Sequence, residues 1–259
     1  MRRFLADLHI HTVLSPCAER EMLPALIVRE ALRKGLDVIA ICDHNAAGNV
    51  GAVAAAAVTA AAAGASPGLM VVPGMEITTA EEVHVVGLFP DTASAVGAAR
   101  EVREGLPLWK ALTAFGPEGA LRRPAQDLVD AEGRPRGFEE KMLASASVFS
   151  LGRAVDLIRE YGGLAVAAHV DRKAFSVPGQ LGFFPPDIRF DALEISAAGA
   201  ARGRVAQFEG EGPALISSSD SHFLSDMGAS ATALEMEALS FTELRMALAG
   251  AEGRRCGIA

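Results

Sequence analysis

Residues 4–12 read FLADLHIHT, an apolar run that ends in two histidines two positions apart, His9 and His11. The run predicts a short strand over residues 4–8. On a strand, residues i and i+2 face the same side, so both imidazoles can reach a single ion. Taken alone, the pair is more typical of two polar residues on an exposed strand face.

The other four histidines also follow or interrupt apolar, β-prone runs. Strands are predicted over residues 37–42, 69–73, 83–89, 164–168, 191–195, 214–217 and 231–236. Within these runs or just after them stand His44, Glu76, His84, His169, Asp220 and His222. Singly, each has an ordinary explanation, such as a turn residue, a helix cap or a buried core histidine. In an α/β barrel, however, strand ends converge on one face, and imidazoles gathered there with carboxylates form a metal site.

Helical stretches alternate with these strands, which is typical of βα units and a parallel sheet. Helices are predicted over residues 24–34, 50–64 and 151–161. We therefore expect one α/β domain over residues 1–259. This alternation of strands and helices is interrupted over residues 91–150, which contain Gly116-Pro117 and the only tryptophan, Trp109. This segment is predicted to be an insertion, either a lid or substrate wall above the barrel mouth or a solvated elaboration without a chemical role.

The composition restricts the classes of partner. The chain carries a formal net charge of −8, and non-specific binding to nucleic acid rests on a basic surface. A stable complex with duplex nucleic acid is therefore not expected. A small phosphorylated substrate is compatible with this charge, because bound divalent cations reverse the local sign.

The cysteines and apolar runs indicate the cellular setting. The three cysteines form no CxxC pair and no even-numbered framework, which favours a reducing, cytoplasmic location. The N-terminus lacks a long apolar segment, so no signal peptide is expected. The longest apolar run, residues 50–64, is shorter than the ~20 residues that span a membrane. The oligomeric state is not readable from the sequence.

Five short motifs, taken in order, resemble the metal-binding motifs of the PHP (polymerase and histidinol phosphatase) family. They are DLHIHT at residues 7–12, CDHN at 42–45, GMEI at 74–77, AAHVDR at 167–172 and SSDSH at 218–222. The resemblance runs through most of the chain and leaves out residues 91–150. It implies a distorted seven-stranded (β/α) barrel with two or three divalent metal ions at its mouth. Zn, Mn and Fe all tolerate such a mixture of nitrogen and oxygen ligands.

The resemblance also implies how the ligands are shared. One ion would be held by His9, His11, Glu76 and Asp220; a second by Glu76, His84 and His169; a third by His44 and His222. The segment after HIHT departs from the family pattern, because Cys17 stands where a histidine is often found. Cys17, as a thiolate, or Glu19 is a candidate ligand of the third ion. The alternative for Cys17 is a small buried hydrophobe.

The expected activity is hydrolysis of a small phosphomonoester, a nucleotide or a short oligonucleotide by a metal-bridging hydroxide. Asp220, His222 and His44 are the candidate catalytic residues. Arg172 and Arg20 are the candidate phosphate-binding cations, because a guanidinium suits bidentate contacts with phosphate. Two other functions remain possible: a non-catalytic regulatory domain that binds metal and phosphate, and an amidohydrolase-like hydrolase.

Overall fold

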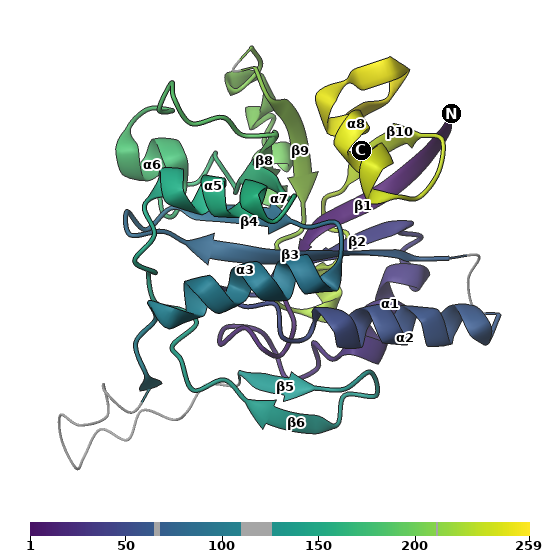
Figure 1. Ribbon diagram of the computed structural model, residues 1–259. Helices are drawn as coiled ribbons and strands as arrows, with labels where there is room; N and C mark the ends of the chain where they lie inside the picture. The colour runs from purple at the N-terminus through teal and green to yellow at the C-terminus, as the bar shows by residue number, and fades with distance from the viewer. Residues whose placement is uncertain (65–67, 110–125, 211) are drawn as a thin grey trace.

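The computed structural model describes residues 1–64, 68–109, 126–210 and 212–259 (Figure 1). Its strands are β1 (Arg2–Ile10), β2 (Val38–Ile41), β3 (Met70–Thr78), β4 (His84–Leu88), β5 (Asp127–Val129), β6 (Pro135–Phe138), β7 (Leu164–Ala167), β8 (Ala192–Ser196), β9 (Ala214–Ser218), β10 (Thr232–Met236) and β11 (Arg255–Ile258). Its α-helices are α1 (Pro24–Arg33), α2 (Val50–Ala62), α3 (Thr92–Glu104), α5 (Leu151–Glu160), α6 (Val177–Leu181), α7 (Ala197–Ala201) and α8 (Phe241–Ala249).

Nine strands form one curved sheet in the order β11-β10-β1-β2-β3-β4-β7-β8-β9. The two ends of the sheet approach each other, because β11 lies beside β9. Beyond the end of β9, the chain reaches β1: Ile10 pairs with Ser221 in a parallel bridge. The amide of His11 donates to the carbonyl of Ser221 at 3.0 Å. The sheet is thus a nearly closed barrel, and the predicted α/β barrel fold is confirmed.

The interior of the barrel is a separate apolar cluster, built from alternate residues of the strands. It includes Val38, Ala40 and Cys42 of the β2 segment and Ala192 of β8, and α8 adds Leu244, Ala247 and Leu248. The intervening residues belong to a second cluster, in which α1, α2, α3 and α5 pack against the outside of the sheet. Period-2 alternation therefore sorts each strand into an inner and an outer face.

The sheet is mixed, whereas the sequence predicted a parallel one. Strand β4 runs antiparallel to both β3 and β7, because β3 and β4 are joined by a short hairpin rather than by a helix. Strands β10 and β11 also pair antiparallel, and β11 was not predicted. The reversal of β4 has a consequence for the site. Its first residue, His84, lies at the barrel end where the parallel strands finish.

Residues 91–150 contain regular structure where they are described. Helix α3 packs against β3, as a barrel helix does. Strands β5 and β6 form a two-stranded sheet apart from the barrel, seen at the bottom of Figure 1. Residues 110–125, including Gly116-Pro117, lie outside the described residues, and the assignment of 91–150 as an insertion stays a prediction. Among the described helices, none has the length and apolar character that crossing a membrane requires.

Candidate metal centre

Alternation along the strands brings the predicted ligands to one end of the barrel interior. On the β2 segment, the inner positions Val38, Ala40 and Cys42 are followed two residues later by His44. Two such steps lead from Val72 to Glu76 on β3 and from Ile216 to Asp220 after β9. On β4 the step runs backwards, from Leu88 and Val86 to His84. These side chains therefore reach the barrel mouth in phase with the core.

Two local irregularities bring the remaining histidines into the same space. The pairing of β1 with β2 shifts register between Asp7 and Ile10, and such a bulge changes the direction of the side chains that follow. Leu8 belongs to the interior cluster, and His9, its neighbour in sequence, nevertheless contacts inner residues. His169, which follows the inner residue Ala168, has a positive φ of 31°. This kink directs its imidazole to the site.

Glu76 lies at the centre of the site. Its side chain is 1% exposed, and five imidazoles have a nitrogen within 3.7 Å of one of its oxygens. The closest are His84 Nδ1, 2.7 Å from Oε1, and His44 Nδ1, 2.8 Å from Oε2. Burial raises the pKa of this carboxyl, but the positive field of His84, His9 and His44 outweighs it and holds the pKa well below its usual range.

These contacts have the spacing of a chelating set but not the geometry of hydrogen bonds. Both oxygens of Glu76, and the Nδ1 atoms of His44 and His84, have no hydrogen-bond partner among the described residues. His9 Nε2 lies 3.2 Å from His11 Nε2 and 3.5 Å from Glu76 Oε1. Ligand atoms about 2.1 Å from one cation are about 3.0–3.4 Å apart in octahedral or tetrahedral geometry. The buried unpartnered atoms therefore fit metal ions.

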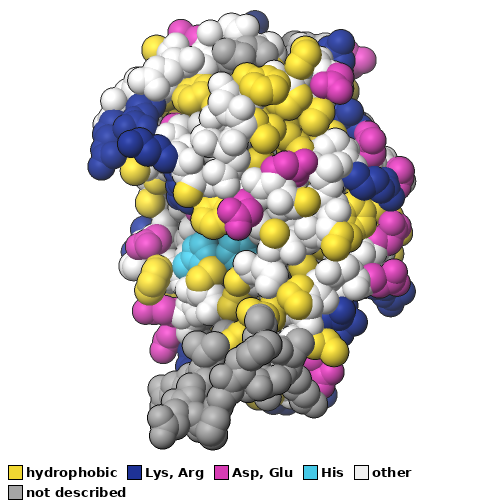
Figure 2. Space-filling view, turned by 90° about the vertical axis from the view of Figure 1, so that its left-hand side faces the viewer, with side chains coloured by type: hydrophobic (Ala, Val, Ile, Leu, Met, Phe, Trp, Pro, Cys, Tyr) yellow, Lys and Arg dark blue, Asp and Glu magenta, His cyan; other side chains and the backbone are white. Residues whose placement is uncertain are grey.

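Three groups of potential ligands lie close enough to share ions. They are His9, His11 and Glu76; His44, Glu76 and His84; and His11, His44 and His222. Asp220 adjoins the first group, with Oδ1 3.1 Å from His11 Nε2 and 3.5 Å from His9 Nε2. His169 adjoins the second, with Nε2 3.4 Å from Glu76 Oε1. The six histidines, Glu76 and Asp220 are thus brought together. Figure 2 shows histidine side chains gathered where they reach one face of the molecule.

The segment after HIHT brings Cys17 to the cluster. Its sulfur lies 3.2 Å from His44 Nε2. Burial alone would raise the pKa of this thiol, but hydrogen bonds with His222 and His44 bring it down to about 7. Cys17 is exposed rather than a buried hydrophobe. Glu19 and Arg20 are also exposed, and neither side chain contacts the histidines in the part of the chain that the structure describes.

Hydrogen bonds orient the rings of three histidines, His9, His222 and His11. Each bond is made by the ring nitrogen that faces away from the cluster. His9 Nδ1 donates to the buried carboxylate of Glu194 on β8, at 3.0 Å from Oε2. His222 Nδ1 donates to the carbonyl of Asp220. In each case Nε2 keeps its lone pair free for a cation. Glu194 was not predicted as a site residue. The available signal was its acid side chain within the buried run DALEI, two residues after the inner Ala192.

The third of these histidines, His11, is oriented by two consecutive hydrogen bonds. Its Nδ1 donates to Ser15 Oγ at 2.9 Å, and Ser15 Oγ donates to Asp43 Oδ1 at 2.7 Å. Asp43 also accepts from the amide and the hydroxyl of Thr12. Asp43 is fully buried, so these bonds supply the partners that its carboxylate needs. The loop after β1 is thereby tied to the end of β2, and His11 and His44 are held side by side, with ring centroids 4.5 Å apart.

Asp7 lies on β1, two residues before His9, and its side chain is fully buried. Its oxygens accept from the amide and hydroxyl of Ser219 and from the amide of Gly228. It therefore anchors the segment that carries Asp220 and His222.

Arg172 lies next to the cluster. Its side chain is 43% exposed, and Nη1 donates to Asp220 Oδ2 at 2.7 Å. The pKa of Asp220 is lowered: burial would raise it, but His9 and His11 prevail. One oxygen of Asp220 thus faces the histidines and the other faces a cation.

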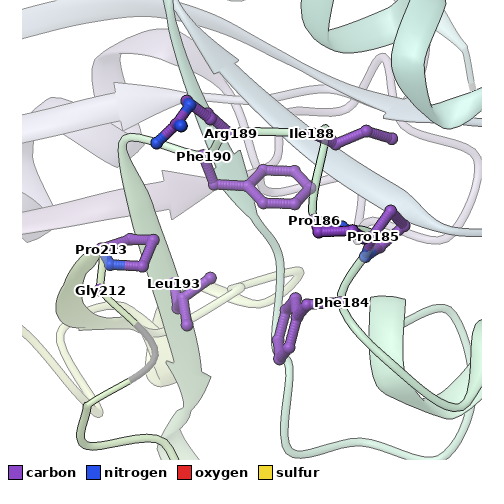
Figure 3. Close-up of a pocket in the computed structure, with 9 residues that line it drawn as sticks. All are labelled: Phe184, Pro185, Pro186, Ile188, Arg189, Phe190, Leu193, Gly212 and Pro213. Atoms are coloured by element: carbon purple, nitrogen blue, oxygen red, sulfur yellow. The ribbon is translucent and has the colours of Figure 1, made fainter.

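A separate cavity of about 490 Å³ lies beside the outer face of β8 (Figure 3). Phe184, Phe190 and Leu193 line it together with Arg189. Leu193 belongs to the outer cluster, and none of the histidines borders this cavity. It is not part of the metal centre.

Comparison with known proteins finds solved structures that resemble this one. Neither a protein-family model nor a curated protein matches the chain. Among solved structures, the lesion-specific endonuclease PfuEndoQ from Pyrococcus furiosus superposes with a TM-score of 0.66 at 17% identity, over 98% of this chain and 58% of the endonuclease. The chain thus spans little more than half of that relative. Endonuclease Q has also been solved with a 27-mer duplex that carries an abasic lesion at the active site.

Two further structures match over most of both chains. A proposed metal-dependent phosphoesterase from Bifidobacterium adolescentis has a TM-score of 0.55 and 18% identity, over 84% of this chain and 87% of that one. An amidohydrolase from Chromobacterium violaceum has a TM-score of 0.54 and 21% identity, over 86% and 89%. At these identities the likeness concerns the fold. The chain therefore has the PHP-like fold that its motifs predicted, with buried histidine and glutamate clusters at the barrel mouth.

Replacing Glu194 with Gln tests the support of His9. An amide can donate where the carboxylate only accepts, so the tautomer that exposes the Nε2 lone pair of His9 is no longer enforced. We expect metal affinity to fall about 10- to 100-fold, as measured by titration of the metal-free protein. Glu235→Gln, a neutralisation at an exposed position of β10, is the matched control. Unchanged affinity in Glu194→Gln would contradict the role given to Glu194.

Proposed function

We propose that the protein is a metal-dependent phosphoesterase that hydrolyses a small phosphomonoester, a nucleotide or a short oligonucleotide. One observation carries the proposal. The carboxylate of Glu76 is buried, makes no hydrogen bond within the described chain and lies among five imidazoles. Leaving a buried carboxylate without hydrogen bonds is costly unless the group has another partner. Divalent cations are the partners that this set of nitrogen and oxygen donors favours.

The assignment of residues to ions follows the ligand sharing implied by the motifs. His9, His11, Glu76 and Asp220 would hold the first ion. Glu76, His84 and His169 would hold the second. His44, His222 and Cys17 would hold a third. Zn, Mn and Fe are the candidate metals.

When bound, such ions make hydroxide available near neutral pH and take up charge on the phosphoryl oxygens. The chain's own residues orient and supply protons. Asp220 faces His11 with one oxygen and Arg172 with the other, so it links the ligand cluster to the substrate side. His222 is 20% exposed and donates through Nδ1 to a carbonyl, which leaves Nε2 as the atom that can carry a proton. His44 is the second candidate proton donor to the leaving oxygen in the absence of the third ion.

Arg172 is the better placed of the two candidate phosphate-binding cations. Its guanidinium already donates to a carboxylate oxygen of Asp220 at the edge of the cluster. A phosphate oxygen can replace that carboxylate oxygen as the acceptor. Arg20 is exposed and forms no ion pair with any residue that the structure describes. It remains a candidate phosphate-binding residue only because it follows the loop that carries Cys17.

The charge of the chain favours a small substrate over a nucleic-acid duplex. The chain has a net charge of −8, and a duplex binder gains most of its affinity from Lys and Arg contacts with phosphates. The duplex in the endonuclease Q complex belongs to that protein, of which this chain matches 58%. We therefore assign a small substrate and include a short duplex with an abasic site among the compounds to be tested.

The first experiment is a screen of phosphorylated metabolites, nucleotides and short oligonucleotides with protein loaded with Mn or Zn. For any substrate found, His11→Ala and Asp220→Ala should each lower kcat/KM by about 100-fold or more, because each removes a ligand of the first ion. The fold should be retained, since the site lies at the barrel mouth. Asp187→Ala, at an exposed position, should leave activity unchanged.

Near-normal turnover in both ligand variants would overturn the assignment. A protein that binds metals tightly but hydrolyses no phosphoester would support the regulatory domain instead. Hydrolysis of amides or lactones alone would support the amidohydrolase-like alternative.

Replacing Arg172 with Gln tests phosphate binding. We expect KM to rise about tenfold with a smaller change in kcat, because the guanidinium contributes to binding of the phosphate dianion. Arg172→Lys should recover part of the loss. Lys173→Gln removes a neighbouring exposed charge and serves as the control. An equal KM in Arg172→Gln and the wild type would exclude this role.

Replacing Cys17 with Ser tests the third ion. If the thiolate is a ligand, metal content measured by elemental analysis should fall by about one equivalent per chain, because a hydroxyl binds zinc more weakly. Cys256→Ser, which lies away from the histidines on β11, should keep the full content. Unchanged metal content in Cys17→Ser would remove Cys17 from the ligand set.

A further inference from the structure

An exposed aromatic ring, Phe175, lies at the rim of the metal centre. Its ring stacks on that of His84, with centroids 4.6 Å apart and planes inclined by 22°. The residue is nevertheless 42% exposed. One face of the ring is thus covered by an imidazole of the cluster, while much of the rest meets solvent. Contact with an apolar or aromatic group of a ligand would cover this exposed area, which is favourable in free energy.

The backbone of Phe175 is in a conformation that a bulky residue rarely adopts. Its φ is +59°, in the left-handed region that favours glycine or asparagine. Seven non-glycine residues in the described chain have a positive φ, and four of these belong to the metal centre or contact it: Asn45, His169, Phe175 and Asp220. Strain of this kind persists where the surroundings impose it, and it concentrates at functional sites. Phe175 shares this property with two proposed metal ligands.

Hydrogen bonds fix the ring relative to the site. The carbonyl of Phe175 accepts from the amide of His84 at 2.8 Å. The next residue, Ser176, donates to the carbonyl of Arg172 at 2.6 Å and caps α6 by accepting from the amide of Gly179. Hydrogen bonds therefore hold the loop from Arg172 to Ser176 in place at both of its ends. The ring is held in place before any substrate arrives, which reduces the entropy lost on binding.

We propose that Phe175 is a specificity residue that stacks on a planar aromatic group of the phosphorylated substrate, such as a nucleobase or an aryl leaving group. This inference rests on the proposed phosphoesterase function. A phosphoryl group bound between Arg172 and the cluster places the rest of the substrate at the rim, where the ring lies. Phe223, which follows His222 and is 41% exposed, offers a second aromatic surface beside the cluster.

The chemistry of the surface defines the class of ligand. The side chain of Phe175 offers a π-face and no hydrogen-bonding group, so it recognises planarity rather than a particular base. A sugar phosphate or a polyol phosphate gains no stacking there. A ring that only shielded His84 from water would instead affect all substrates equally, through metal binding.

The test compares two substrates that differ by the aromatic group, adenosine 5′-monophosphate and ribose 5-phosphate, with metal-loaded protein. The variants are Phe175→Asn, which tolerates a positive φ without a ring, and Phe175→Tyr, which keeps the ring. Phe183→Asn removes a phenylalanine that is 60% exposed and stacks on none of the described histidines, and it is the control. Metal content and Tm are measured for each variant.

We expect the wild type to prefer the nucleotide by about tenfold or more in kcat/KM. In Phe175→Asn this ratio should fall towards one, mainly through the KM for the nucleotide, with metal content retained. Phe175→Tyr should restore the ratio, and Phe183→Asn should leave it unchanged.

The outcomes separate this inference from the function on which it rests. Hydrolysis of both compounds with no preference, or an equal loss on both in Phe175→Asn, overturns the stacking role and leaves the phosphoesterase intact. If neither is hydrolysed, binding of both compounds is measured by calorimetry. Ring-dependent binding without hydrolysis of any phosphoester supports the stacking surface and refutes the phosphoesterase, and absence of ring-dependent binding refutes the stacking surface.

Discussion

The buried carboxylate of Glu76 is the constraint on which the arrangement of the site depends. A carboxylate in the interior must have compensating partners, because its desolvation costs several kcal/mol or more. No described donor supplies a hydrogen bond of good geometry, and five imidazoles face it instead. The polar atoms converge on shared points in space rather than on one another. This convergence distinguishes a site for cations from an ordinary buried polar network.

The barrel achieves the convergence with few departures from regular structure. Most of the ligands continue the inner face of a strand by one more period-2 step, as His44 follows Cys42 and Asp220 follows Ser218. The remaining ligand candidates depend on the bulge in β1, the kink at His169 and the positive φ of Asp220. Gly74 lies on the same inner face between Val72 and Glu76, and a Cβ there would come within 2.9 Å of the Ile41 carbonyl. Close approach of β2 and β3 below Glu76 thus requires glycine.

The sequence predicted most strand positions and the histidines and carboxylates that gather at the barrel mouth, because both depend on short-range patterns. An apolar run followed by His or an acid marks a strand end, and period 2 assigns the face. Strand direction depends on long-range pairing, so the antiparallel course of β4 was missed, although a parallel neighbour would have required a longer connection between residues 78 and 84. Glu194 was missed because its role is defined only by His9, which is 185 positions away. The positive φ of Phe175 has no sequence signal at all, since phenylalanine is among the residues least expected there.

The contact between Asp7 and Ser219 joins residues that are 212 positions apart. The first strand and the exit of β9 are thereby fastened together, and each carries part of the chelating set. A nascent chain that has not yet reached β9 lacks Asp220 and His222, so the cluster of histidines and carboxylates is incomplete until β9 and the residues after it have been made. Any free energy gained from cations is then added to the finished barrel, because closing this long loop precedes it. Whatever the cluster binds therefore meets a complete set of side chains only after β1 and the exit of β9 have come together.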